Sequence, residues 1–262
     1  MKDINKSDNN LNHKTTSISI ITVCYNSEAT IERTIKSVLL QDYTPIEYII
    51  IDGNSKDGTL EIIKKYRKNI TKVISEPDKG IYDAMNKGIE LASGEIIGIL
   101  NSDDIYTSDT IISEIVGQFV KRDIQLLYGN ITFFKNNPNK AIRTWVTKPY
   151  YEGFFEHGEV APHPSLFVKK EVYNKIGTYQ SDFKITSDYE FMLRALRINN
   201  YKSYHFNKFI VNMQMGGEST KSIKNIMQGN KEITISWKIN GISPPIYFWP
   251  LRIYKKIKQY FS

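Results

Sequence analysis

The feature that most constrains the fold is a regular alternation of β-branched apolar runs with helical patterns. Strand-like runs occupy Ile18–Val23, Tyr48–Ile51 and Thr71–Ser75. A helical pattern of apolar residues follows Ser27, and a second helix is predicted from Thr59 to Lys68. This strand–helix order predicts an α/β fold with a parallel, doubly wound sheet flanked by helices. The length of 262 residues fits one such domain, with or without an appendage.

Polar residues follow four of the predicted strands at the point where each strand ends. In a sheet of this kind, ligands bind outside the carboxyl ends of the strands. Turn chemistry explains Asp, Asn or Gly at any one end, but less readily at all four. The convergence therefore predicts a site for a nucleotide-like ligand and a metal ion. The residues concerned are Tyr25, Asn26, Asp52, Glu76–Gly80, Asp103 and Asp104.

The acidic pair Asp103–Asp104 ends a buried apolar strand, Ile96–Leu100. Two adjacent carboxylates in such a place are costly unless another charge compensates them. A divalent metal on a phosphate ligand would do so. The alternative is that Asp104 or Ser108 begins the next helix while Asp103 is solvated.

A helix is predicted from Ile81 to Ala92, and Gly80 frees the turn before it. Lys79 lies at the N-terminal end of that helix, where an anion is also favoured. Asp83 and Asn86 share one helix face. Both are candidates for ligand contacts, and the alternative is that both are simply solvated.

A further helix is predicted from Thr186 to Asn199, with Asp188 in its first turn. The helix dipole stabilises a carboxylate there, so this position alone requires no chemical role. Arg194 lies about two turns along the helix from Asp188. It could pair with an acidic group or a phosphate, or remain solvated.

The middle of the chain gives weaker signals. Ile124–Phe134 and Ala141–Val146 alternate as a hairpin would. The aromatic stretch Lys148–Gly158 is either an active-site loop that stacks on a ligand or covers the site, or a surface loop packed by its own aromatics. His163, between two prolines, is either structural or a substrate contact. Tyr201–Met215 is predicted to form a pair of strands.

The C-terminus differs in composition from the rest. A helical tail is predicted over 218–262, and its last part, Pro245–Ser262, has four basic residues and no acid. A basic amphipathic helix with aromatic residues suits a membrane interface. The alternative is a helix docked on the core or on a partner subunit. The basic residues are Arg252, Lys255, Lys256 and Lys258, and the apolar face comprises Leu251, Tyr254, Ile257 and Phe261.

Bulk properties narrow the function classes. The formal net charge of +7 favours anionic partners without choosing among them. No apolar run is long enough to span a bilayer. The polar N-terminus, residues 1–16, has no apolar segment of the secretory type, so we expect a disordered leader and a cytoplasmic location. Cys24, the single cysteine, is expected in the core.

Taken in order, the motifs resemble those of family-two glycosyltransferases with the GT-A fold, whose central sheet is Rossmann-like and mostly parallel. The segment "EPDKGIYDAMNKGI" is similar to the branch that builds bacterial surface polysaccharides, of the colanic-acid type. This resemblance implies a catalytic domain over residues 17–217, followed by the helical tail. The matching stretches are "ITVCYNSEATIERTIKSVLLQDY", "IEYIIIDGNSKDGT", "SEPDKGIYDAMNKGIELASGEIIGILNSDDIY" and "HPSLFVKKEVYNKIGTYQSDFKITSDYEFMLRAL".

The resemblance also implies roles for the polar strand ends. Asp103 would contact the ribose or a metal-bound water, and Asp104 would ligate Mn²⁺ or Mg²⁺ bridging the diphosphate. The first of the acidic positions often seen in the family is Asn101 here, which leaves two carboxylates. Asp52 would accept a hydrogen bond from the base and Tyr25 would pack on it. An acceptor at this point suits uracil and hence a UDP-sugar.

The resemblance places the general base at Asp188, with Glu190 as the alternative. Inverting transfer needs a carboxylate that removes the proton of the acceptor hydroxyl as it attacks. Lys79 and the metal would neutralise charge on the departing diphosphate, and Asp83 would belong to the same donor-binding edge.

The resulting expectation is an inverting, metal-dependent hexosyl- or N-acetylhexosaminyltransferase. Its donor would be a nucleotide sugar, and its acceptor a lipid-linked glycan at the inner face of the cell membrane. Self-association into a homo-oligomer is left open, and no motif supports nucleic-acid binding. Two alternatives are a nucleotidyltransferase, which lacks its glycine-rich activation loop here, and a non-catalytic nucleotide-sugar-binding or membrane scaffold protein.

Overall fold

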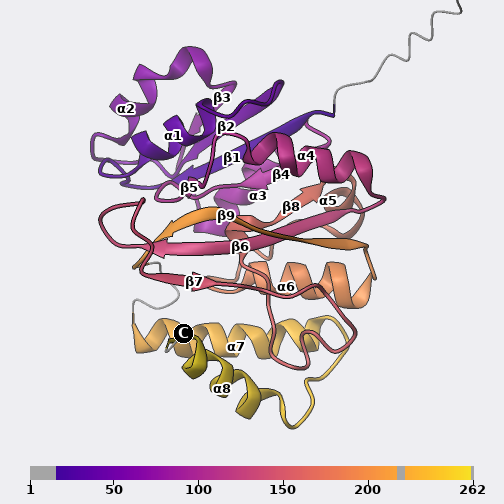
Figure 1. Ribbon diagram of the computed structural model, residues 1–262. Coiled ribbons are helices and arrows are strands. Elements are labelled where there is room, and N and C mark those ends of the chain that lie inside the picture. Colours follow the sequence, from indigo (N-terminus) through magenta and orange to yellow (C-terminus); the bar gives the residue numbers. More distant parts are fainter. Residues whose placement is uncertain (1–15, 217–221, 261–262) are drawn as a thin grey trace, which may run out of the picture.

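The computed structural model describes residues 16–216 and 222–260, with side chains up to Lys255. The predicted leader therefore lies outside the described residues except for Thr16, and so does the predicted domain boundary at 217. The described strands form one nine-stranded sheet in the order β3-β2-β1-β4-β8-β6-β9-β5, and β7 pairs with β6 (Figure 1).

Four adjacent strands are parallel: β1 (Ile18–Cys24), β2 (Ile46–Asp52), β3 (Lys72–Ser75) and β4 (Ile96–Ile99). In the register, Ile18 lies opposite both Ile46 and Ile96, and Cys24 lies opposite Asp52. The carboxyl ends of the four strands therefore meet at one edge. The predicted parallel sheet is confirmed, and so is the core position of Cys24, which is 5% exposed.

Helices cover both faces of the sheet (Figure 1). Ile18 and Ile20 of β1 face one core, and Ile21 and Val23 face the other, as the alternation of a strand requires. The first core is covered by α1 (Ile31–Leu39), α2 (Thr59–Lys65) and α4 (Ile111–Lys121), and the second by α3 (Ile81–Leu91), α5 (Lys170–Ile176) and α6 (Ser187–Met192).

The second half of the sheet mixes directions. The predicted hairpin is confirmed, because β6 and β7 are antiparallel neighbours, and β8 pairs antiparallel with both β4 and β6. Their bounds, with those of the two remaining strands, are β5 (Ile105–Tyr106), β6 (Leu126–Phe134), β7 (Arg143–Trp145), β8 (Phe167–Lys169) and β9 (Ser203–Gln214).

The strand pair predicted over Tyr201–Met215 is wrong, since β9 is one long strand parallel to β6. Phe206 pairs with Gly129 and Phe209 pairs with Asn130, so the polar residues Asn207 and Lys208 fall in an irregularity of the register. A bulge accommodates these residues within one continuous strand.

Helix boundaries in the middle of the chain also differ from expectation. The helix after the acidic pair begins at Ile111 rather than at Asp104 or Ser108. The short helix α5 was not predicted. Helix α6 continues as π-helical turns over Leu193–Ile198, so the helical segment as a whole fits the predicted range.

The two C-terminal helices, α7 (Ile223–Ile239) and α8 (Phe248–Tyr260), lie side by side beyond α6 (Figure 1). Trp237 and Phe248 are buried with ring centroids 5.4 Å apart, and the Lys255 Nζ lies 2.5 Å from a Glu159 carboxylate oxygen. One face of α8 is thus docked on the core. Its Ile253 and Tyr254 are 56% and 62% exposed.

Candidate active site

The carboxyl ends of β1 and β2 are joined by side chains of the two loops that follow them. Asn26, in the left-handed region at φ 48°, receives a hydrogen bond on its side-chain oxygen from the Lys56 N–H at 2.9 Å, and its own N–H donates to Ser55 Oγ at 2.8 Å. The Ser27 N–H donates to Thr59 Oγ1 at 2.7 Å. These bonds fix the loops beside the sheet edge.

Asp52 is fully buried at the end of β2. Its carboxylate accepts the Ser55 N–H at 3.1 Å and the Ser75 hydroxyl at 2.6 Å, and the Ser55 hydroxyl also donates to it. Most of its hydrogen-bonding capacity is therefore used within the protein. A nucleotide base would have to share or displace one of these donors.

A more open acceptor lies nearby and was missed as a site residue. A Cβ on Gly53 would lie 2.5 Å from Asp78 Oδ2 and 3.3 Å from the Tyr25 ring, so the glycine lets both side chains lie close against the backbone. Burial raises the pKa of Asp78. Tyr25 is 63% exposed. The sequence signal was present, because Asp78 belongs to the polar segment after β3.

Lys79 and Asp83 lie where the sequence suggests, at the start of α3. Asp83 Oδ2 accepts the Lys79 N–H at 3.0 Å, so the carboxylate caps the turn before the helix. The Lys79 side chain is exposed. Lys87 lies 3.7 Å from Asp83 and 2.9 Å from Glu76, so the charge of Asp83 is partly compensated within the helix.

The two carboxylates of the acidic pair have different surroundings. Asp104 is fully buried, and it accepts the Gln214 N–H on Oδ1 at 3.2 Å and the Asn101 side-chain amide on Oδ2 at 3.3 Å. Asp103 remains partly exposed. Burial raises the pKa of both groups, and the charge of Asp103 raises that of Asp104 further. Arg33 donates to the Asp103 carbonyl at 3.1 Å.

The donor set fits a cation whose ligands are mostly oxygens of water and phosphate. No cluster of three or more His, Cys, Asp or Glu occurs among the described residues. Mg²⁺ and similar ions at nucleotide sites often take only one or two protein carboxylates and complete their shell with phosphate and water. Asp103 offers a partly exposed carboxylate, and Asn101 Oδ1 is buried without a hydrogen-bond partner in the described chain.

Asp188 is brought to the same edge by a tyrosine of α3. The Tyr82 hydroxyl lies 3.0 Å from Asp188 Oδ1 and 2.8 Å from the Ile185 carbonyl oxygen, so its one hydrogen is shared between two acceptors. Asp188 is half-buried, and no described residue donates a hydrogen bond to its other oxygen. Burial raises the pKa of Tyr82, and the charge of Asp188 raises it further. Tyr82 is therefore held as a protonated donor.

Glu190, the alternative base, is enclosed by the protein and paired with its own helix. Glu190 is fully buried and forms a two-bond ion pair with Arg194, with both N–O distances at 2.9 Å. Asn240 also donates to Glu190 at 3.0 Å. Arg194 thus pairs with a carboxylate of its own helix, one of the roles considered from the sequence. Between the two acidic residues, only Asp188 is open to a reacting group.

Aromatic residues line the region behind Asp188. His163 Nε2 lies 3.1 Å from the Tyr179 hydroxyl, and burial lowers the pKa of His163 although the charge of Asp188 opposes this. Phe154 and Phe155 of the predicted loop are buried, and the ring centroids of Phe155 and Tyr189 lie 5.6 Å apart. Phe154 and Phe155 contact each other and belong to the hydrophobic core, so the loop is packed partly by its own aromatics and partly by the core.

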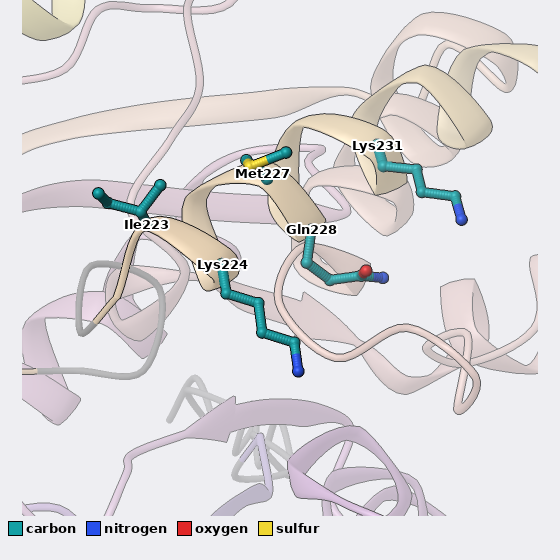
Figure 2. A pocket seen from close by; sticks show the side chains of 5 residues that line it. All are labelled: Ile223, Lys224, Met227, Gln228 and Lys231. Atoms are coloured by element: carbon teal, nitrogen blue, oxygen red, sulfur yellow. The ribbon is translucent and has the colours of Figure 1, made fainter.

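A separate hollow lies on α7, outside this edge. It is lined by residues of that helix, none of them a predicted site residue: Ile223, Lys224, Met227, Gln228 and Lys231 (Figure 2). Among the described helices, none has the length and apolar character that crossing a bilayer requires.

Comparison with known sequences bears on this geometry. Residues 19–192 match the profile of the family described as glycosyl transferase family 2. That range runs from β1 to the end of α6 and so contains every predicted site residue. An uncharacterised glycosyltransferase of Mycobacterium tuberculosis is 34% identical over 181 residues, which cover 68% of each chain.

Solved structures share the fold at low identity. S. aureus TarS, crystallised in complex with UDP, aligns with a TM-score of 0.64 and 17% identity over 84% of this chain and 65% of that one. Pyrobaculum calidifontis mannosyltransferase PcManGT, in complex with GDP-Man and Mn²⁺, aligns with a TM-score of 0.62 and 15% identity over 89% and 67%. This chain thus spans less than two thirds of the TarS chain. The predicted mostly parallel sheet of the GT-A type is confirmed.

Proposed function

This chain belongs to glycosyl transferase family 2, and we propose that it is an inverting, metal-dependent enzyme that moves a hexosyl or N-acetylhexosaminyl group from a UDP-sugar to a hydroxyl group. The observation that carries the proposal is the 3.0 Å contact of Tyr82 with Asp188. It holds a half-exposed carboxylate beside the first turn of α3, at the edge where four parallel strands end.

In this mechanism Asp188 removes the proton of the acceptor hydroxyl as that oxygen attacks the anomeric carbon. Tyr82 donates to one oxygen of the carboxylate and leaves the other free to accept the proton. Exposed Lys79, at the start of α3, provides a positive charge for the departing diphosphate. The sealed Glu190–Arg194 pair supports the choice of Asp188 as base.

For the metal we propose Asp103 as the carboxylate ligand, with Asn101 Oδ1 beside it. Asp104, fully buried and hydrogen-bonded within its turn, then holds the turn in shape, which departs from the ligand role that the sequence suggested. Bound Mn²⁺ or Mg²⁺ would neutralise charge on the diphosphate.

The donor base is proposed to bind at Tyr25 and Asp78, the two side chains that lie against Gly53, close to Asp52 at the end of β2. Uracil has a ring N–H that a carboxylate can accept, which favours UDP. The UDP complex of TarS supports this choice. The GDP-Man complex of PcManGT keeps guanine as the main competitor.

For the acceptor we propose a lipid-linked surface glycan, of the kind built by colanic-acid-type enzymes, reached by binding the cytoplasmic face of the cell membrane. Exposed apolar side chains and lysines lie together on the C-terminal helices. Between 222 and 255 the one acidic residue, Glu232, is buried. The exposed groups include Ile223, Lys224, Met227 and Lys231 on α7 (Figure 2) and Ile246, Ile253 and Tyr254 at α8.

The test is nucleotide release from a panel of UDP-, GDP- and dTDP-sugars, with and without Mn²⁺. We expect metal-dependent release from one donor by the wild type and its loss in Asp103→Asn and Asp188→Asn. Failure to bind any donor in calorimetry would exclude a glycosyltransferase. Binding without release under every acceptor tried would favour the non-catalytic nucleotide-sugar-binding protein instead.

Membrane binding is tested separately by sedimentation with vesicles. We expect the protein to sediment with vesicles of anionic lipid and to remain in solution with neutral lipid. Lys224→Glu combined with Lys231→Glu should reduce sedimentation. Equal binding to both vesicle types would remove the electrostatic part of the proposal.

A further inference from the structure

One buried carboxylate outside the predicted site collects an unusual number of backbone donors. Glu232 of α7 is 1% exposed. Its Oε1 accepts the Lys184 N–H at 2.8 Å, and its Oε2 accepts the Ile185 and Thr186 N–H groups, both at 2.9 Å. Three consecutive backbone amides therefore converge on one side chain.

The three amides belong to the segment that leads into α6. Thr186 is the N-cap residue of that helix, and no side chain of the helix caps it. Buried backbone amides at the start of a helix need a hydrogen-bond acceptor. Here the acceptor is the carboxylate of Glu232, 46 residues further along the chain than Thr186. Asp188 lies two residues after Thr186.

The same segment is held from its other side by the tyrosine that contacts the proposed base. The Ile185 carbonyl oxygen accepts the Tyr82 hydroxyl at 2.8 Å, while the Ile185 N–H donates to Glu232. Tyr82 and Glu232 thus hold one peptide segment between them, and Tyr82 also contacts Asp188. A shift of this segment would move the base and its donor together.

The electrostatics favour a charged Glu232. Burial raises the pKa of Glu232, but hydrogen bonds from Gln228 and from the three amides outweigh it and lower the pKa on balance. The negative charge of Glu232 also raises the pKa of Tyr82. It therefore helps to keep the Tyr82 hydroxyl protonated as a donor to Asp188.

Helix α7 lies unusually close to the segment at this point. A Cβ on Gly229 would lie 3.2 Å from Ile185 Cγ2 and 3.4 Å from Thr186 Cγ2. Glu232 is 40 residues beyond the end of the family match at 192. The C-terminal helix is thus built against the base-bearing segment rather than appended to the domain.

We propose that Glu232 is a positioning residue for the transfer reaction: its carboxylate fixes the 184–186 segment so that Asp188 and Tyr82 keep the geometry needed to activate the acceptor. The inference rests on the proposed role of Asp188 as base. It assigns a function to α7 that is separate from any contact with a membrane.

The experiment compares Glu232→Gln with Glu171→Gln, an exposed carboxylate on α5, as the matched control. A glutamine keeps the size of the side chain but places an amide donor against backbone donors. We expect kcat to fall about 10- to 100-fold, as for small displacements of a catalytic group. The donor Kd, measured by calorimetry, should change less than twofold. Glu232→Asp should recover part of kcat.

A double-mutant cycle separates positioning from general destabilisation. In an Asp188→Asn background, Glu232→Gln should cost no further activity, because both changes act through one group. Independent losses in kcat, or equal losses in kcat and donor affinity, would overturn the proposal.

Amide hydrogen exchange provides a readout that does not depend on activity. Exchange at 184–186 should be faster in Glu232→Gln than in the control, and unchanged exchange would overturn the proposal. If the wild type binds no nucleotide sugar, the proposed function fails, while this comparison still decides whether Glu232 holds the segment.

Discussion

The two halves of the sheet offer carboxylates to the candidate site in opposite ways. In the half where we propose that the nucleotide binds (the nucleotide half, residues 18–104), Asp52 and Asp104 are fully buried, and protein donors that include Ser55, Asn101 and Gln214 bond to their carboxylates. In the acceptor half, residues 105–260, Asp188 is half-exposed and held by Tyr82, more than a hundred residues earlier. A carboxylate at this edge of the sheet can therefore either hold a loop in place or remain open to a ligand, and its contacts distinguish the two roles.

The largest effect is expected from Asp188→Asn. Loss of a general base should lower kcat by about 10²- to 10⁴-fold. Donor affinity should stay within about twofold because the change lies outside the nucleotide half. Steady-state transfer assays and calorimetry measure the two quantities. Asp182→Asn, an exposed change in the loop before α6, is the control. A large loss of donor affinity in Asp188→Asn would break the division between the halves.

The next effect compares the two members of the acidic pair. Asp103→Asn should weaken Mn²⁺ binding by at least about 100-fold if Asp103 is the metal ligand. Asp104→Asn should cost about 10-fold, as expected when a residue only supports a ligand from behind. Calorimetric titration of Mn²⁺ in the presence of UDP measures both. The reverse order would restore Asp104 as the ligand, as the sequence suggested.

A smaller effect is expected from adding a methyl group at Gly53, beside Asp78 and Tyr25. Gly53→Ala places a methyl group 2.5 Å from Asp78 Oδ2, so that side chain must move. We expect donor affinity to fall about 10-fold, the cost of modest overpacking. Gly117→Ala on α4 is the matched control, since a Cβ there meets nothing within 4 Å. Equal affinity in both variants would place the base elsewhere.

Most of the nucleotide half could be predicted from sequence, because its strands are apolar runs of local pattern and its site residues lie directly after them. The predicted meeting of the ends of β1, β2, β3 and β4 is confirmed by their parallel register. The pattern did not reveal which of Asp103 and Asp104 is buried. Buried Asp104 accepts a hydrogen bond from the Gln214 N–H, which β9 brings there.

The acceptor half was less predictable, because its contacts join distant segments. The single strand β9 was predicted as two, because the sequence does not show that β6 lies beside it along its length. Glu232 is the one acid between 222 and 262, and nothing in its spacing indicates that it binds amides of 184–186. Such pairings become visible only when the chain is folded.

The smallest effect tests the acidic pair Asp103–Asp104 through the pH dependence of stability. Burial raises the native pKa of Asp103 and Asp104 above that of the unfolded chain. Between the ordinary aspartate pKa and the raised native value, the native state binds more protons than the unfolded state, so the free energy of unfolding should fall as pH rises through that window. Each unit of difference corresponds to about 1.4 kcal/mol. Urea unfolding in EDTA, for the wild type and for Asp104→Asn, measures the contribution.

We expect the unfolding free energy of the wild type to fall relative to that of Asp104→Asn as pH rises. Mn²⁺ with UDP should reverse that trend in the wild type, because a bound cation compensates the ionised carboxylates. A flat difference in EDTA would mean that Asp104 ionises without penalty, and that the two halves of the sheet treat their carboxylates alike. A downward trend that Mn²⁺ and UDP leave unchanged would keep the burial of Asp104 and remove the metal from its neighbourhood.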